Sequence, residues 1–181
     1  MGFGIALRGL EVLGARDGDL ELLASLVAGG RAGQERIDDE LEHDNTSNGQ
    51  NAAALAKAAI PTPEAKAEAW ESIVVKGDLS NALQGSAVTG FTRVLDTSLL
   101  EPYAEKYFEA VPGIMASRTH ALASQIVVGL YPAQLTTQAT VDRTDEFLAS
   151  LPEGSSALRR MMLENRDGVA RALRARQADV G

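Results

Sequence analysis

The chain has 181 residues, no cysteine and a net charge of -8. This length suffices for one domain with a buried core, and the lack of thiols excludes disulfides, cysteine-based zinc sites and thiol catalysis. An acidic surface repels a phosphate backbone, so we expect no nucleic-acid partner. Hydrophobic residues form 45% of the chain but aromatic residues only 4%, which favours closely packed helices rich in Ala and Leu.

The first helix signals are apolar residues spaced three and four apart. Ile5 to Arg16 carries such a stripe, and a second one begins near Leu20 and ends at Gly29-Gly30, where glycine can close a helix in the left-handed conformation. The two segments end alike, because Gly14, Arg16 and Gly18 are matched by Gly29, Arg31 and Gly33. Repetition of this kind is typical of stacked helical hairpins.

Hydroxyl residues and prolines mark the next helix starts. A hydroxyl can accept a hydrogen bond from an early helix amide, and proline fits the first helical position. On these signals we predict helices over Gln34–Asp44, from Thr46 to Ala59, from Thr62-Pro63 through Glu64–Val75 to Gly77, and over Leu79–Phe91, with Gly90 weakening the last.

Pro112-Gly113 and Pro132 are the strongest breaks in the second half of the chain. We therefore predict a helix from about Leu99 that ends at Pro112-Gly113, followed by a long helix from Ile114 to Leu130. Because that helix is apolar on nearly every side, we expect it at the centre of the fold. Two further helices are predicted to begin at Thr137 or Thr140 and at Ser155 or Ser156, the last running to about Arg176.

No stretch alternates with a period of two for long enough to predict a strand. The pattern gives roughly nine or ten helices, many of them short, joined by short links. We therefore predict an all-α fold, in which stacked antiparallel helical hairpins similar to HEAT or armadillo repeats form a single domain over residues 1–181.

Potential metal ligands are few. Neither histidine belongs to an H-E-x-x-H motif. Asp39 and His43 lie four residues apart among further acids and could hold a metal loosely, but no second ligand segment is identifiable, so an exposed acidic face is the favoured interpretation. We expect no catalytic residue, no metal ligand and no cofactor in this chain.

Other candidate motifs are weak. His120 would need distant partners for a Ser-His-Asp triad, and no G-x-S-x-G motif is present, which favours a packed or partly exposed histidine. Gly29-Gly30-x-x-Gly33 lacks the spacing and the lysine of a phosphate-binding loop. Arg159, Arg160 and Arg166 could bind a carboxylate if they faced a cavity, but a surface position is the default. The larger aromatic residues are predicted to anchor the core: Trp70, Tyr103, Tyr107, Phe108, Tyr131 and Phe147.

The charge is unevenly distributed. After Leu151 there are six arginines against four acids, and the acidic excess lies earlier in the chain. A basic tail on an acidic body suggests a docking face. Cations near the end of a helix also offset its dipole, however, and a solvated face is the favoured interpretation.

Three stretches resemble a known family when taken in order: Thr62-Pro-Glu-Ala-Lys-Ala-Glu-Ala-Trp70, Val127-Val-Gly-Leu-Tyr-Pro132 and Leu163-Glu-Asn-Arg-Asp-Gly-Val-Ala-Arg-Ala-Leu173. They resemble the C-terminal helical domain of actinobacterial aminopeptidase N, in the gluzincin M1 family. The resemblance extends from about Leu20 to the end of the chain.

The resemblance implies a non-catalytic domain of a zinc-dependent enzyme that removes N-terminal residues from peptides. Such a domain would pack against the catalytic domain of the same parent chain, cap the active site, form part of the peptide chamber and meet peptides at its concave face. The zinc motif and the exopeptidase motif are missing here, so no activity carries over to any residue of this chain. We interpret the chain as a C-terminal fragment whose native start is not Met1.

Two other functions remain open at this stage. The chain could be a free-standing helical-repeat adaptor that binds a protein or peptide in its groove, or an independent hydrolase built around His120. The sequence has no secretory signal and no apolar run long enough to cross a bilayer, so we expect a cytoplasmic protein without a membrane partner.

Overall fold

The computed structural model describes residues 17–180. Within that range the chain forms nine α-helices, one π-helical segment and one 3-10 turn, and contains no strand. In chain order these are α1 (Asp17–Ala28), α2 (Gln34–His43), α3 (Ser47–Ala59), α4 (Pro63–Trp70), the π-helical segment Glu71–Lys76, α5 (Asn81–Thr92), the 3-10 turn Thr97–Leu100, α6 (Glu101–Ser117), α7 (His120–Gly129), α8 (Gln138–Ser150) and α9 (Ser156–Val180). The helix predicted over Ile5–Arg16 lies outside the described residues.

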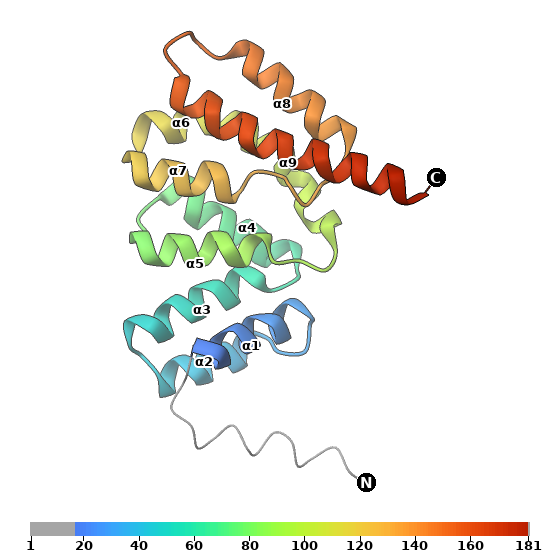
Figure 1. Ribbon diagram of the computed structural model, residues 1–181. Helices are drawn as coiled ribbons and strands as arrows, with labels where there is room; N and C mark the ends of the chain where they lie inside the picture. The colour runs from blue at the N-terminus through green and yellow to red at the C-terminus, as the bar shows by residue number, and fades with distance from the viewer. Residues whose placement is uncertain (1–16, 181) are drawn as a thin grey trace.

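The helices stack one above another in two layers (Figure 1). One layer consists of α1, α3, α5, α7 and α9, which contact each other in that order. The other layer consists of α2, α4, α6 and α8, each packed against the helix that follows it in the chain. The prediction of an all-α array of stacked helical hairpins is therefore confirmed.

Side-chain hydroxyls begin several of these helices. Thr46, Thr62 and Thr137 each accept a hydrogen bond from the amide three residues later, at 3.2–3.3 Å, as the sequence predicted. Ser80 and Thr119 do the same for α5 and α7 at 3.4 Å. Because these bonds satisfy amides that have no partner inside the helix, they fix where each helix starts.

The predicted break at Pro112-Gly113 is wrong. Helix α6 continues through both residues and ends at Ser117, and a short extended link at Arg118 separates it from α7. Pro112 and Gly113 are exposed, while Val111 and Ile114 on either side are buried and hold the helix against the core. Packing thus outweighs the hydrogen bond lost at proline. The predicted helix Ile114–Leu130 is divided between α6 and α7, because the backbone is extended at Arg118 and Thr119.

The end of the predicted helix Glu64–Val75 differs in geometry. Helix α4 becomes π-helical after Trp70, and the segment ends at Gly77, whose φ of 63° lies in the left-handed region. The guanidinium of Arg118 donates hydrogen bonds to the carbonyl oxygens of Val74 at 2.9 Å and Gly77 at 2.6 Å. Arg118 thus satisfies carbonyl groups that the helix end leaves free.

The core consists of two parts. A smaller, aliphatic cluster joins α1, α2 and α3, and a larger one joins the remaining helices. The predicted aromatic anchors all belong to the larger cluster, where Trp70 is partly buried and the others are buried: Tyr103, Tyr107, Phe108, Tyr131 and Phe147. Their role as core residues is confirmed.

Helices α3 and α5 approach closely where Gly90 faces Leu55. A Cβ atom at position 90 would overlap the carbonyl oxygen of Leu55. The helix predicted to end at Phe91 ends at Thr92, and Gly90, expected to weaken it, has the further role of permitting this contact by lacking a side chain.

Lys66 is fully buried where these two helices end. Its ammonium group donates to the carbonyl oxygens of Ala58 at 2.6 Å, Phe91 at 2.9 Å and Gly90 at 3.4 Å. The cation therefore meets the negative ends of two helix dipoles and supplies donors to their last carbonyls. Burial lowers the pKa of Lys66 to about 8, so the group remains mostly charged at neutral pH.

Replacement of Lys66 by methionine should destabilise the fold by about 2 kcal/mol or more, because it leaves buried carbonyls without a donor. Urea denaturation followed by circular dichroism measures this loss. Lys57→Met is the matched control: Lys57 is exposed, its partner is Asp38 at 3.2 Å, and the expected loss is below about 1 kcal/mol. Equal losses in the two variants would contradict the assigned role.

The stability that depends on Lys66 should rise with pH. Between the folded pKa of about 8 and the unfolded value of 10.5, the unfolded chain binds more protons at this group than the folded chain does. The free energy of unfolding of the wild type, minus that of Lys66→Met, should therefore increase by up to about 3 kcal/mol between pH 8 and pH 10.5. A difference that stays flat across this range would contradict the lowered pKa of Lys66.

Candidate functional site

The acidic helix α2 does not gather metal ligands. The Nδ1 atom of His43 donates to the backbone carbonyl of Asp39 at 2.7 Å, not to its carboxylate. Across residues 17–180, no three His, Cys, Asp or Glu side chains converge closely enough to hold a metal ion. The side chains present therefore do not fit a zinc site in this part of the chain.

His120 and the glycine motif have structural positions. His120 is exposed at the first turn of α7. Gly30, with a φ of 66°, closes α1: its amide donates to the carbonyl of Val27, and the amide of Arg31 donates to that of Leu26, both at 2.8 Å. This is the Schellman arrangement that ends helices, and it confirms the left-handed cap predicted there.

The three arginines considered above as carboxylate ligands, Arg159, Arg160 and Arg166, all contact groups of this same chain. Arg159 donates to the carbonyls of Leu148 at 3.0 Å and Leu151 at 3.3 Å, at the end of α8. Arg160 pairs with Glu164 one turn later on α9 at 2.8 Å. The contacts of Arg159 with helix-end carbonyls give it a structural role, whereas Arg160 forms an exposed surface pair.

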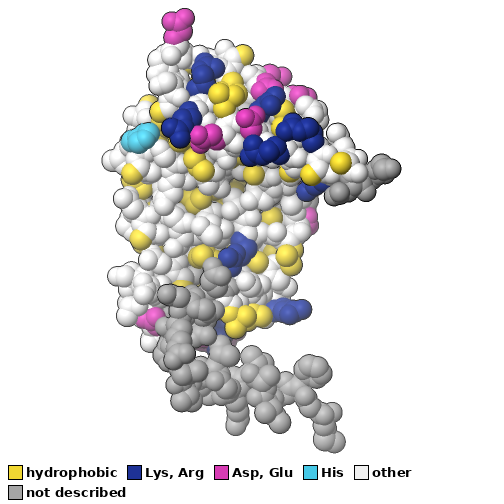
Figure 2. Space-filling view, viewed as in Figure 1, with side chains coloured by type: hydrophobic (Ala, Val, Ile, Leu, Met, Phe, Trp, Pro, Cys, Tyr) yellow, Lys and Arg dark blue, Asp and Glu magenta, His cyan; other side chains and the backbone are white. Residues whose placement is uncertain are grey.

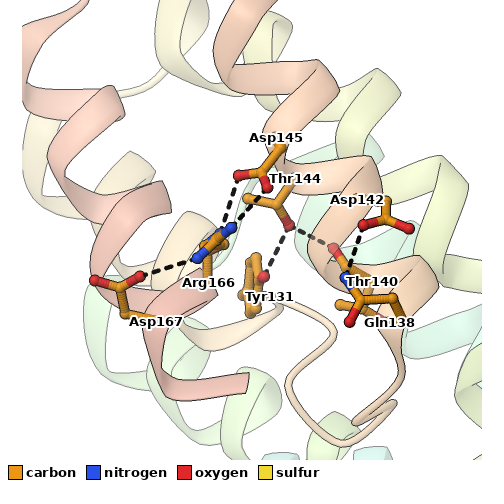
Figure 3. A network of polar contacts seen from close by, with 8 residues as sticks. All are labelled: Tyr131, Gln138, Thr140, Asp142, Thr144, Asp145, Arg166 and Asp167. Atoms are coloured by element: carbon orange, nitrogen blue, oxygen red, sulfur yellow. Dashed lines mark hydrogen bonds and ion pairs between the residues drawn. The ribbon is translucent and has the colours of Figure 1, made fainter. Parts of the chain in front are cut away.

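Arg166 belongs to a polar network between α8 and α9 (Figure 3). Its guanidinium holds both carboxylate oxygens of Asp145, at 2.7 and 3.0 Å, and reaches Asp167 at 3.4 Å. A bidentate pair of this kind fixes the relative position of two helices more firmly than a single contact does. Basic and acidic side chains are accordingly mixed over this end of the array in Figure 2.

The buried part of this network joins Tyr131 to α8 (Figure 3). The Thr144 hydroxyl donates to the carbonyl of Thr140 at 2.7 Å, so it accepts from the Tyr131 hydroxyl at 2.8 Å. Burial raises the pKa of Tyr131. The phenol therefore stays protonated at neutral pH and acts as a structural donor, while Tyr107 likewise donates to the carbonyl of Val127 at 2.6 Å.

A pocket of about 660 Å³ lies between α6 and α8. Its walls come from α6, from the link between α7 and α8, and from α8: Glu101, Ala104, Glu105, Phe108, Pro132, Leu135, Thr137, Ala139, Thr140, Asp142, Arg143 and Glu146. The volume is in the range of about 300–1,000 Å³ that is usual for ligand sites. None of the residues singled out in the sequence as possible ligand-binding groups lines it, and Phe108, which does, was predicted as a core residue.

One ion pair spans the pocket. The Arg143 guanidinium donates to both carboxylate oxygens of Glu105 at 2.7–3.0 Å and lies 4.7 Å from the centre of the Phe108 ring. These hydrogen bonds lower the pKa of Glu105. The sequence contained one sign of this site, the acidic pairs at i and i+4 on α6 and α8, but not the fact that the two pairs face each other.

Comparison with known proteins places this array in a family. Residues 20–171 match the family of ERAP1-like C-terminal domains. The chain belongs to this family. A relative, aminopeptidase N of Streptomyces lividans, is 51% identical over 154 residues, which are 85% of this chain but 18% of that protein.

The match of the ERAP1-like C-terminal domain covers most of the described array. It includes α2 to α8, the pocket and Lys66, and ends within α9. The resemblance inferred from the three sequence stretches is therefore confirmed at the level of the domain. Among the described residues, no helix is both long enough and apolar enough to cross a membrane.

The Tyr131–Thr144 bond can be tested by a double-mutant cycle. Thr144→Val should cost about 1–3 kcal/mol, because it leaves the buried Tyr131 hydroxyl without its acceptor. Adding Tyr131→Phe removes that hydroxyl, so the double variant should be no less stable than Thr144→Val alone. Free energies of unfolding from urea titrations decide the matter, and strictly additive losses would refute the coupling.

Proposed function

We propose that this chain is the non-catalytic C-terminal domain of a zinc-dependent aminopeptidase that removes N-terminal residues from peptides. The single observation that carries the proposal is the 51% identity to an aminopeptidase N over 85% of the chain. The match to ERAP1-like C-terminal domains supports it independently. The chain spans only 18% of the length of the aminopeptidase, so the activity of the whole protein is part of the proposal.

In this proposal the domain is a wall of the active-site chamber. Stacked hairpins form an extended surface, and the bonds between successive helices keep that surface in shape. The domain would cap the active site of the parent's catalytic domain and admit peptides along its concave face, excluding folded proteins and bulk water. Zinc and the groups that act on the peptide bond would belong to the catalytic domain.

The partners in this proposal are therefore the catalytic domain of the same parent chain and peptide substrates. We place the protein in the cytoplasm as part of the same proposal, supported by the absence of cysteine from the sequence. The adaptor and the hydrolase centred on His120 are the competing functions that an experiment has to separate.

The gene and the full-length protein test the proposal together. The reading frame should encode an H-E-x-x-H motif followed by a distant Glu before this domain. The full-length product should release the first residue of a peptide, lose this activity in chelator and regain it with zinc. This chain alone should release none. A frame without the motif, or an inactive full-length product, would favour the adaptor, and hydrolysis by this chain in chelator would favour the hydrolase.

The capping role needs its own measurement. A variant of the full-length protein that lacks residues 17–180 should still cleave an aminoacyl reporter. It should also begin to cleave folded proteins that have a free N-terminus, which the intact protein rejects. Hydrogen exchange of the full-length protein, with and without a slowly cleaved peptide, covers the case in which the shortened product fails to fold. Unchanged exchange throughout this domain on peptide binding would overturn the chamber role.

A further inference from the structure

We propose that the pocket between α6 and α8 binds an extended polypeptide segment through a basic side chain flanked by apolar residues. The guanidinium or ammonium group would bind among the carboxylates at the rim of the pocket. The apolar neighbours of that residue would contact the floor. This inference goes beyond the aminopeptidase assignment and does not depend on it.

The floor of the pocket is apolar and fixed. Phe108, with the Arg143 guanidinium over its ring, and Pro132 are buried beneath it, and Ala104, Leu135 and Ala139 present the apolar surface that a ligand can reach. Apolar groups of an incoming segment would leave water on this floor, which gains about 25 cal/mol for each Å² removed from solvent.

The wall above the floor is held in place by hydrogen bonds. The buried Thr140 donates through its hydroxyl to the carbonyl of Leu135 at 2.6 Å, and Thr137 caps the first turn of α8. Behind it, the rings of Phe108 and Phe147 lie 5.6 Å apart and join α6 to α8. The pocket is therefore formed before any ligand arrives, which lowers the entropy cost of binding.

The rim carries more negative than positive charge. Four carboxylates line the pocket against one cation, Arg143, and that cation is bound to Glu105. Asp142 accepts only a neutral amide bond, from Gln138 at 2.8 Å. Among the described residues Glu101 and Glu146 have no ion-pair partner.

Other cations near the pocket are engaged elsewhere. Arg176 donates to the carbonyl of Thr136 at 3.4 Å, in the link that precedes α8. Lys106 on α6 lies over the ring of Tyr103, 5.0 Å from its centre. The exposed carboxylates of the pocket thus attract a positive group. The apolar wall beside them has a low dielectric constant and focuses their electric field into the pocket.

The arrangement fits a side chain better than a metal ion. No three carboxylates here converge as metal ligands within the described residues. Lysine and arginine combine an apolar stem with a charged head, and this matches an apolar floor beneath a carboxylate rim. Arginine should bind more tightly than lysine, because its planar group can hold a carboxylate with two hydrogen bonds.

Fluorescence anisotropy with a labelled peptide, acetyl-Gly-Leu-Arg-Leu-Gly-amide, tests the proposal on the full chain. The acetyl group prevents removal of its first residue, so the measurement is independent of any peptidase activity. Binding should weaken as salt increases from about 20 mM to about 200 mM. A peptide with neutral citrulline in place of arginine should bind about ten-fold more weakly, and one with serine in place of both leucines should also bind less tightly.

Variants of the rim locate the site. Glu146→Gln and Asp142→Asn should each weaken binding about three-fold, and the double variant about ten-fold. Glu68→Gln on α4 is the matched control, since Glu68 is exposed and outside the pocket, and it should leave binding unchanged. Peptide-induced NMR shifts should fall on Ala104 and Ala139. Equal effects of control and rim variants, equal binding of the citrulline peptide, or shifts elsewhere would overturn the proposal.

Discussion

The position of α3 relative to α5 depends on a buried charge. Lys66 donates to carbonyl groups from the ends of both helices, and those carbonyls have few other partners once the helices end. The helices must therefore meet at one distance and one angle, which Gly90 permits by lacking a side chain at the contact with Leu55. A buried ammonium group would be costly alone, and here the hydrogen bonds to the carbonyl oxygens and the helix dipoles offset part of the loss of water, the remainder of which lowers the pKa of Lys66.

Similar bonds from side chains to helix ends continue through the array. Arg118 binds the end of the π-helical segment, Arg159 binds the end of α8, and Gln84 on α5 donates to Gln125 on α7 at 2.8 Å. The two arginines satisfy carbonyl groups that a short helix leaves free, and the glutamine pair joins two neighbouring helices of the stack through their side chains. An array made of many short helices has many such ends, so its shape rests on these bonds as well as on apolar packing.

The sequence predicted the features that depend on residues close together in the chain. The hydroxyl caps at Thr46, Thr62 and Thr137 and the glycine ends at Gly30 and Gly77 located most helices, because each depends on residues a few positions apart. Features that depend on distant residues were missed. Buried neighbours carry α6 through Pro112, and Lys66 meets its acceptors only after α3 and α5 have packed. The pocket was missed for the same reason, since its two acidic pairs lie about forty residues apart.

Those acidic pairs are a poor choice for stability alone. Glu101 and Glu105 repel each other at i and i+4 on α6, and Asp142 and Glu146 do so on α8. The dipole at the start of α6 favours Glu101, whereas Glu146 lies beyond the first turns of α8 and interacts with the charge of Arg143 without a direct ion pair. Cations compensate some carboxylates of these two helices, as Arg143 does for Glu105 within the pocket and Arg166 does for Asp145 outside it. Four carboxylates from two helices therefore gather around an apolar floor although local repulsion disfavours it, and such departures from local stability are expected where a surface binds something else.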